Sequence, residues 1–325
     1  MKTAIITGIS GQDGAYLASF LIKKDYKIIG ITRSHNFDLF RKLDYLNIER
    51  NKILIEECDL LDFPSIINLL TKYQPDEIYN LAAQSSVGLS FKQPIGTINF
   101  NVNSVLNLLE GIRIVKPDTR FYQASSSEMY GKVKDLPIGI DTPMHPLSPY
   151  AISKAAAHWT VVNYRESYGV FACNGVLFNH ESYLRSSNFF VKKVISESIQ
   201  NKDNPNWVLR VGNIEIKRDF GYSPKYVEAM WLMLQKERSE DFIICSGKSI
   251  TLRSIIEYVF KKLEIPLIRL VIDSDFMRPT DIEDIYGDNS PAKIKLGWEN
   301  NLDFYKVLDI LIEEELSFFN RETKT

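Results

Sequence analysis

Two short stretches of the sequence carry residue types that could handle protons. Residues 125–131 read SSSEMYG and supply hydroxyls and one carboxylate, that of Glu128. Residues 150–154 read YAISK, which places the phenol of Tyr150 and the ammonium of Lys154 one helical turn apart on the same face. Tyr150 could take the proton of a substrate hydroxyl while the carbon that bears this hydroxyl gives up a hydride. The hydroxyl of Ser126 could hydrogen-bond to the same substrate oxygen.

The chemistry of these groups extends beyond alcohol oxidation. A phenol with an ordinary pKa of about 10 is a poor base, but the Lys154 ammonium would favour its phenolate form. Once a substrate carries a ketone, a carboxylate such as Glu128 can remove the neighbouring proton, and a hydroxyl one carbon further leaves as water. Each feature alone also occurs as an ordinary exposed helix pair or strand-end carboxylate. Together they make Ser126, Glu128, Tyr150 and Lys154 our candidate catalytic residues.

A strand followed by a glycine-rich turn begins the chain. Residues 4–7 are apolar, residues 8–14 read GISGQDG, and a helical pattern covers 15–24. Glycines permit the tight turn and let backbone N–H groups approach a pyrophosphate at the helix N-terminus. A plain surface turn is the alternative interpretation. We expect a dinucleotide here, bound by Gly8, Ser10, Gly11, Gln12, Asp13 and Gly14.

The strand ends that follow indicate which dinucleotide binds. Arg33 ends the strand expected at 27–33, about twenty residues beyond the glycines, where the ribose-reading residue belongs. An acidic residue there would select NAD, whereas a guanidinium suits a 2′-phosphate, so we predict NADP. Asp59 could accept a hydrogen bond from an adenine amino group or cap the next helix, and these roles are compatible. Ala82 and Ala83 are small enough for a flat ring to approach the backbone.

The order of elements predicts an α/β protein. Apolar strand-like segments at 4–7, 27–33, 53–58, 77–81, 120–124 and 173–179 alternate with helical segments at 15–24, 65–73, 97–115 and 153–168. This alternation favours βαβ units and a mainly parallel sheet with helices on both faces. After residue 179 the rhythm changes. Residues 180–188 are polar and resemble a loop, and the segments 277–281 and 289–293 are rich in helix and strand breakers.

We therefore expect two domains. Residues 1–178, with a return segment at about 212–235, would form a Rossmann-type doubly wound parallel sheet that binds NADP. Residues 179–325 would form a smaller mixed α/β domain that binds the substrate. Beyond residue 179 the pattern predicts helices at 189–200, 225–234, 251–263 and 302–319 and strands at 207–211 and 242–245. Basic residues in or beside the loops of this half of the chain suit a nucleotide diphosphate, although each alone could be a solvated surface charge.

Composition excludes several classes of protein. The 325 residues are 45% hydrophobic and 25% charged, as in a soluble globular protein, and the net charge of -2 predicts neither nucleic acid nor a membrane as partner. Three widely spaced cysteines argue against a disulfide framework or a zinc site, and we expect no metal. No apolar run reaches membrane-spanning length, and the chain leads directly into a strand without a signal peptide. We expect a cytoplasmic protein.

Several motifs together resemble a known family. They are TGISGQDG at 7–14, SSSEMYG at 125–131, SPYAISK at 148–154, NYRESYG at 163–169, LFNHES at 177–182 and YVEAMW at 226–231. From residue 1 to about residue 297 the chain resembles GDP-mannose 4,6-dehydratases, which are extended short-chain dehydrogenase/reductases. The resemblance implies a tightly bound, recycled NADP and a GDP-sugar substrate. It implies a 4-keto-6-deoxy product, formed by C4 oxidation, loss of water across C5 and C6, and hydride return to C6.

The resemblance also implies roles for individual residues. Tyr150 would be the base at the sugar 4-hydroxyl with Lys154 as its partner, and Glu128 would be the acid/base at C5 and C6. Ser126 stands where the family usually has threonine and keeps the hydroxyl. Further cofactor contacts would come from Asp59, Leu60, Ala82, Ala83, Gln84, Ser85, Lys154, His180 and Arg185. The GDP-sugar would contact Ser86, Ser126, Asn179, Lys192, Lys193, Arg218 and Arg278.

The chain departs from the family in three places. Residues 183–186 read YLRS where the family typically has PRRG, and in the family this loop contacts a neighbouring subunit's cofactor. We expect a homo-oligomer, either a dimer or a tetramer. Gly96 stands where a cofactor-contacting tyrosine is usual, and the segment before Arg278 is shorter. These changes leave GDP-manno-heptose open as a substrate beside GDP-mannose.

Two other functions remain open from sequence. A nucleotide-sugar epimerase or 4-ketoreductase would share the fold, but neither chemistry needs a carboxylate base at C5, which is the role Glu128 would fill. A non-catalytic NADP-binding protein is expected to lose Tyr150 or Lys154, and both are present.

Overall fold

A seven-stranded parallel sheet organises the protein, and the computed structural model describes residues 1–33 and 38–322. Its strands stand in the order β10-β6-β5-β4-β1-β2-β3. Their bounds are β1 Thr3–Thr7, β2 Lys27–Thr32, β3 Ile53–Glu57, β4 Glu77–Asn80, β5 Arg120–Ser126, β6 Ala172–Leu177 and β10 Phe242–Ile244. The order reverses between β1 and β4, and ligands of such sheets bind in the crevice at the carboxyl ends of the strands beside this switch point.

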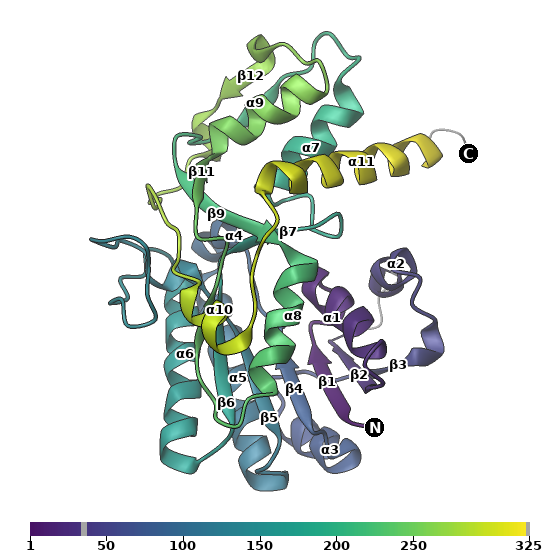
Figure 1. Cartoon of the computed structure of the whole chain (residues 1–325), viewed down its shortest axis with the longest axis vertical. Helices are drawn as coiled ribbons and strands as arrows, with labels where there is room; N and C mark the ends of the chain where they lie inside the picture. The colour runs from purple at the N-terminus through teal and green to yellow at the C-terminus, as the bar shows by residue number, and fades with distance from the viewer. Residues whose placement is uncertain (34–37, 323–325) are drawn as a thin grey trace.

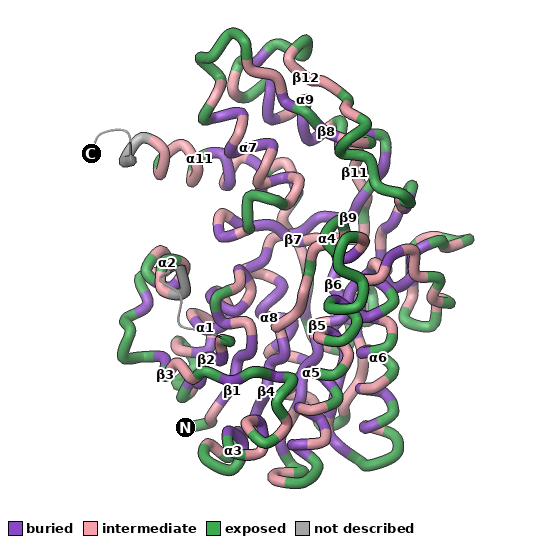
Figure 2. The backbone as a smooth tube through the Cα atoms, turned by 180° about the vertical axis from the view of Figure 1, so that it is seen from behind, coloured by how far each residue is buried: buried purple, intermediate pink, exposed green. Residues whose placement is uncertain are grey.

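Helices cover both faces of this sheet because its strands are apolar on both sides. In β1, Ala4 and Ile6 belong to one core cluster and Ile5 to another. The first cluster includes α1 (Gln12–Ile22), α8 (Ser223–Leu234) and part of α10 (Ser290–Leu296). The second includes α3 (Phe63–Tyr73), α5 (Pro94–Val115) and α6 (Pro149–Tyr168). Figure 2 shows buried residues concentrated along the strands and on the helix faces that meet them. We call this part the sheet body.

The remaining elements form a cap over the carboxyl ends of the strands (Figure 1). The cap contains a three-stranded sheet of β11 (Ser249–Thr251), β9 (Lys217–Tyr222) and β7 (Asn179–Glu181), and a pair of β12 (Leu270–Ile272) and β8 (Leu209–Val211). Its helices are α7 (Phe190–Asn201), α9 (Leu252–Lys262) and α11 (Phe304–Glu322), which share a separate hydrophobic core. None of the helices in the described part of the chain is long and apolar enough to cross a membrane.

Short elements complete the chain. Helices α2 (Asp38–Tyr45) and α4 (Val87–Lys92) lie in the connections after β2 and β4. Single 3-10 turns occur at Arg50–Lys52, Ser127–Met129, Leu267–Arg269 and Ser274–Phe276. In Figure 1, α11 extends outward from the cap above α2, and the Tyr45 hydroxyl of α2 donates to Glu314 of α11.

The predicted Rossmann-type parallel sheet is confirmed, and two segments beyond residue 179 differ locally from their sequence pattern. The loop-like segment at 180–188 begins with strand residues, because β7 pairs with β9, Asn179 opposite Phe220. The breaker-rich segment at 289–293 begins helix α10, because Pro291 occupies the first turn, where its missing N–H costs nothing. The last three residues of the expected 179–325 domain lie outside the described residues.

Candidate active site

The proton-handling residues meet at the carboxyl end of β5. Ser126 ends this strand, and its hydroxyl accepts a 3.3 Å hydrogen bond from the backbone N–H of Glu128 in the turn that follows. Helix α6 packs against both segments and begins at Pro149, because the Ser148 hydroxyl caps its first turn by accepting from Ala151 N–H. Tyr150 and Lys154 therefore stand at the start of α6, where both side chains are buried.

Burial dominates the acidity of the phenol. It raises the pKa of Tyr150 to about 12, although a hydrogen bond with Ser126 and the charge of Arg185 act in the opposite direction and Glu128 adds to the rise. We expected the Lys154 ammonium to favour the phenolate. In the structure, Lys154 Nζ donates to the Ala124 carbonyl at 2.8 Å and lies 5.9 Å from the centre of the Tyr150 ring. Desolvation of the phenol therefore outweighs the nearby positive charges.

The burial of Lys154 also affects the pKa of its own ammonium and the stability of the fold. Burial lowers the pKa of the ammonium to about 8 from 10.5. Between these two pH values the unfolded chain binds a proton that the folded chain does not, so this group makes stability rise with pH across that window. The whole shift corresponds to about 3 kcal/mol.

We predict that Lys154→Met removes this pH-dependent gain. Urea unfolding at pH 8 and pH 10.5 should show a change in unfolding free energy that is smaller in the variant by a few kcal/mol, since methionine does not titrate. Titrations of cysteines and tyrosines occur in both proteins and cancel in the comparison. The exposed Lys52→Met variant is the matched control and should follow the wild type. Equal gains in wild type and Lys154→Met would contradict the buried ammonium.

A cleft of about 2120 Å³ runs from the glycine turn to the ends of the neighbouring strands. Most of the residues that we expected at the cofactor line it. They are Gly8, Ser10, Gly11, Gln12, Asp13, Gly14, Arg33, Asp59, Leu60, Ala82, Ala83, Gln84, Ser85 and Arg185. The two other expected cofactor residues, Lys154 and His180, are buried and hydrogen-bonded to protein atoms.

The shape of the glycine turn fits a dinucleotide. Gly8 has a φ of 68°, and a Cβ on Gly14 would lie 2.4 Å from the Gly8 carbonyl oxygen, so side chains at these positions would push the turn apart. Helix α1 begins at Gln12 directly behind the turn, and its first residues line the cleft. Such a helix start suits a pyrophosphate. The residues present therefore fit a dinucleotide cofactor at this end of the cleft.

Sequence reasoning missed an aromatic group on the far wall of the cleft. The ring of Tyr45 on α2 stacks on Tyr183 at 4.6 Å, and Tyr183 lies 5.7 Å from Phe318 on α11. The Tyr45 hydroxyl donates to Glu314 at 2.9 Å. Lys192, expected at the sugar, lies in this cleft with its ammonium 3.9 Å from the Tyr183 ring and paired with Glu315. These residues come from distant segments, so no sequence pattern joins them.

The other residues expected at the substrate are brought together only in part. Arg218 is buried and donates to the Ile282 carbonyl at 2.6 Å and to Asp281 at 2.9 Å, and Arg278 lies 3.6 Å from the same carboxylate. Lys193 donates to the Arg210 carbonyl at 2.9 Å, and its ammonium lies 4.1 Å from the centre of the Phe276 ring, two residues before Arg278. Asn179 opens β7, and Ser86 caps α4 by accepting from the Leu89 N–H at 3.2 Å.

A second missed residue connects the two ligand-facing regions. The Asn101 amide of α5 donates to the Ser153 hydroxyl at 2.9 Å, and its carbonyl oxygen accepts from Gln84 N–H at 2.8 Å. Ser153 in turn donates to the Tyr150 carbonyl at 2.7 Å. Asn101 is buried in the middle of a helix, and its side-chain amide has all its hydrogen bonds satisfied. A buried polar side chain of this kind indicates a structural role. Asn101 links the cofactor-lining residue Gln84 to the first turn of α6.

The doubly wound sheet, the glycine turn at its switch point and the Tyr-Lys pair on one helix define an extended short-chain dehydrogenase/reductase fold. Solved structures agree. The dTDP-glucose 4,6-dehydratase from Bacillus anthracis in complex with NAD superposes with a TM-score of 0.84 at 18% identity over 96% of each chain. RMD from Pseudomonas aeruginosa in complex with NADPH superposes with a TM-score of 0.81 at 23% identity over 98% of this chain and 99% of that one.

Sequence comparisons identify the family. A sequence model described as GDP-mannose 4,6 dehydratase matches residues 5–311. The GDP-mannose 4,6 dehydratase 1 of Arabidopsis thaliana is 41% identical over 99% of this chain and 91% of that protein. The chain belongs to the GDP-mannose 4,6-dehydratase family, which confirms the resemblance seen in its motifs.

Proposed function

We propose that this protein is a nucleotide-sugar 4,6-dehydratase that acts on GDP-mannose. The observation that carries this proposal is the position of Glu128. It follows the Ser126 strand end directly and lies close enough to Tyr150 for its charge to raise the pKa of that phenol. The family of the chain supports the same substrate class. An epimerase or 4-ketoreductase with the same fold would not need this carboxylate.

The first step is oxidation at C4 of the sugar. Tyr150 takes the proton of the 4-hydroxyl, and Ser126 hydrogen-bonds to the same oxygen, which fixes its position. Lys154 holds the start of α6 against β5 through the Ala124 carbonyl. When bound, the nicotinamide would supply the hydride acceptor for C4 and the hydride donor for C6, and the positive charge of its oxidised form would favour the phenolate.

The second step is elimination. The C4 ketone makes the C5 proton acidic, and Glu128 removes it. The same carboxyl then delivers this proton to the departing 6-hydroxyl, so that water leaves. The proton that Tyr150 took from the 4-hydroxyl balances the proton that C5 needs when hydride reaches C6. Arg218 and Arg278, which share Asp281, are our proposed contacts for the diphosphate of the nucleotide, together with Lys193. The charge of Glu128 acts on the buried Arg218, which supports a nucleotide site close to the elimination site.

A product assay tests the function. Purified protein incubated with GDP-mannose should yield a 4-keto product that absorbs in alkali, with no net consumption of NADPH. GDP-manno-heptose, compared through kcat/KM, decides between hexose and heptose, and UDP- and dTDP-sugars serve as controls. Stoichiometric use of NADPH would instead identify a reductase, and a product that still contains its 6-hydroxyl would identify an epimerase.

We propose NADP as the dinucleotide. Arg33 lies in the cleft just beyond β2, and the same end of the cleft is lined by Arg41, Lys42 and Arg50. Several cations at the ribose end suit a 2′-phosphate. Solved structures of this fold bind either NAD or NADPH, so the fold alone does not choose.

We predict that Arg33→Ala weakens NADP binding by about 10- to 100-fold, the loss of a hydrogen bond to a charged group, and changes NAD binding far less. Titration calorimetry with both cofactors measures this. Arg238→Ala, at an exposed position after α8, is the matched control. Wild-type affinity for NAD equal to or tighter than for NADP would refute the assignment.

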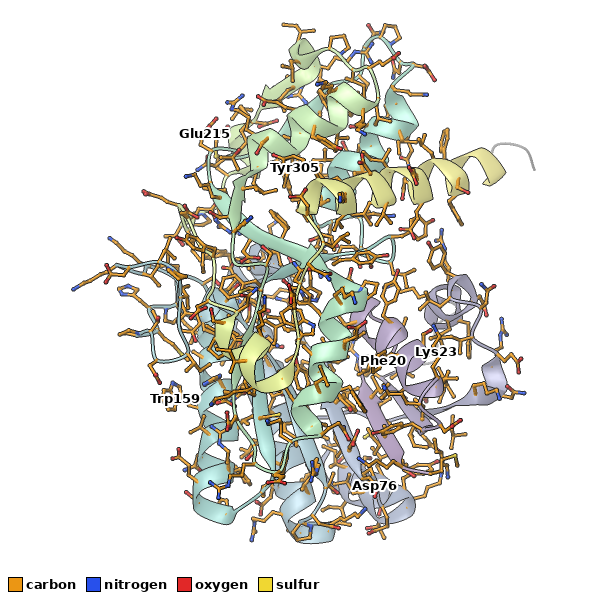
Figure 3. The ribbon with its side chains drawn as sticks, viewed as in Figure 1. Phe20, Lys23, Asp76, Trp159, Glu215 and Tyr305 are labelled. Atoms are coloured by element: carbon orange, nitrogen blue, oxygen red, sulfur yellow. The ribbon has the colours of Figure 1, made fainter. Side chains whose placement is uncertain are left out.

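We propose that the protein assembles through α5 and α6. Their outer faces carry Ile95, Ile98 and Leu106 on α5 and Ile152 and Trp159 on α6, all exposed in the single chain. Trp159 is 59% exposed and points away from the body in Figure 3. Large apolar side chains gathered on adjacent helices are typical of an interface.

We predict a mass of a dimer or larger by light scattering, and a monomer mass for Trp159→Glu, because a buried unpaired carboxylate is costly at an interface. Lys52→Glu is the control for the added charge. A monomeric wild type would refute this interface.

We propose a cytoplasmic location, for which the support is that Cys58, Cys173 and Cys245 are free and buried. We also propose that the boundary near residue 179 separates cofactor binding from substrate binding.

A further inference from the structure

Gln12 and Asp13, the first residues of α1, use their side chains to hold other parts of the chain. The Gln12 amide donates to the His180 carbonyl at 3.1 Å and accepts from the Ser182 hydroxyl at 2.7 Å. The Asp13 carboxylate accepts from His180 Nε2 at 2.8 Å and from the Ser223 hydroxyl at 2.7 Å. The glycine turn is thereby tied to β7 in the cap and to the start of α8.

The imidazole of His180 is fully engaged by protein. Its Nδ1 lies 2.7 Å from the Phe178 carbonyl, so both ring nitrogens face acceptors and the doubly protonated ring satisfies them. The ring is buried and stacks on Tyr226 at 4.6 Å. Burial alone would raise the pKa of Asp13, but the charge and hydrogen bond of His180 bring it down to about 2. The pair is partly buried, and both ring nitrogens of His180 are occupied by acceptors of the protein.

The same contacts determine where Arg185 lies. The Ser182 hydroxyl, held by Gln12, accepts from Leu184 N–H at 3.2 Å, and Arg185 N–H donates to the Ser182 carbonyl at 3.1 Å. This tight turn places the Arg185 guanidinium 3.7 Å from the Phe189 ring and 3.6 Å from the Glu181 carboxylate. The charge of Arg185 acts on Asp13 and on the phenol of Tyr150. Contacts therefore run from the glycine turn to the Ser182 turn and Arg185, and the charge of Arg185 reaches the phenol of Tyr150.

We propose that Gln12, Asp13 and His180 are positioning residues that lock the cofactor turn to β7, so that the sugar held by the cap and the dinucleotide held by the turn stay in register. This inference rests on the proposed function for its kinetic consequence. Hydride transfer needs reacting atoms about 3 to 3.5 Å apart, and a displacement of about 1 Å can cost up to 100-fold in rate. The lock therefore acts on kcat rather than on the binding of either ligand.

Three variants test the lock. Asp13→Ala removes the partner of His180, and Gln12→Ala releases the Ser182 turn. Asp13→Asn is the conservative variant, because an amide can donate to Nε2 of a neutral His180. We expect kcat for GDP-mannose to fall by about 10- to 100-fold in the two alanine variants and to be largely restored in Asp13→Asn. The dissociation constants of NADP and of GDP, measured by calorimetry, should each stay within about threefold of wild type.

Two further measurements keep the outcome decisive. Asp13→Ala and His180→Ala break the same contact between Asp13 and His180. The loss in kcat of the double variant should therefore be smaller than the product of the two single losses. Hydrogen exchange in the holoprotein should be faster across residues 179–187 in Gln12→Ala, and this readout needs no turnover. The exposed Asp118→Ala variant, before β5, is the control for both. The lock would be overturned if NADP affinity fell in parallel with kcat, or if hydrogen exchange at 179–187 were unchanged in Gln12→Ala. If the wild type were inactive on GDP-mannose while Gln12→Ala still exchanged faster, only the proposed function would be refuted.

Discussion

Replacement of Glu128 by glutamine should stop dehydration while leaving the first oxidation intact. Glutamine keeps the size of the side chain but cannot accept the C5 proton, and loss of a general base costs about 10²- to 10⁴-fold in kcat. Because Tyr150 and Ser126 are unchanged, C4 oxidation can still occur, and the hydride stays on the cofactor. Mixing the variant with GDP-mannose in D2O should give an absorbance of reduced nicotinamide and no deuterium at C5.

A second carboxylate in the chain provides the control for Glu128→Gln. Glu257→Gln removes an exposed carboxylate from α9 in the cap and should leave kcat unchanged. Calorimetry should show normal NADP and GDP binding to Glu128→Gln, which separates chemistry from folding. Dehydration at the wild-type rate, with deuterium entering C5, would remove Glu128 from the mechanism and reopen the epimerase and reductase alternatives.

The sequence was informative wherever a local pattern decides the structure. Strand β1, the glycine turn and α1 follow one another without interruption, so periodicity and turn chemistry predicted them directly. The Tyr150 and Lys154 pair follows from helix geometry once Ser148 and Pro149 start α6. The parallel order of the strands followed from the alternation of elements, and it is the sheet that brings Glu128 to Tyr150.

What could not be predicted depends on contacts between distant segments. Strand β7 exists because β9 pairs with it, and the cleft wall of Tyr45, Tyr183 and Phe318 requires α2 and α11 to meet. The chemistry of the candidate active site also depends on contacts between distant segments. Tyr150 is buried enough for desolvation to raise its pKa, which no sequence spacing reveals. Gln12 and Asp13 read as cofactor ligands in the motif, yet their side chains are bonded to His180, Ser182 and Ser223.

Replacement of Tyr150 by phenylalanine should stop the reaction one step earlier than Glu128→Gln. Phenylalanine fills the same buried site but cannot take the 4-hydroxyl proton, so kcat/KM should fall by about 10²- to 10⁴-fold. No reduced nicotinamide should accumulate on mixing with GDP-mannose, in contrast to the Glu128 variant. The two variants therefore assign the two proton transfers to separate residues.

The pH profile supplies the second signature of Tyr150. The base is the phenolate, and burial raises the pKa of the phenol to about 12, so its active fraction grows as pH rises below that value. Wild-type kcat/KM should therefore increase as pH rises through the range below that pKa. Residual activity of Tyr150→Phe should lack this increase. A variant profile parallel to that of the wild type would show that another group takes the proton, and Ser126, which shares the substrate oxygen, would then be the residue to replace next.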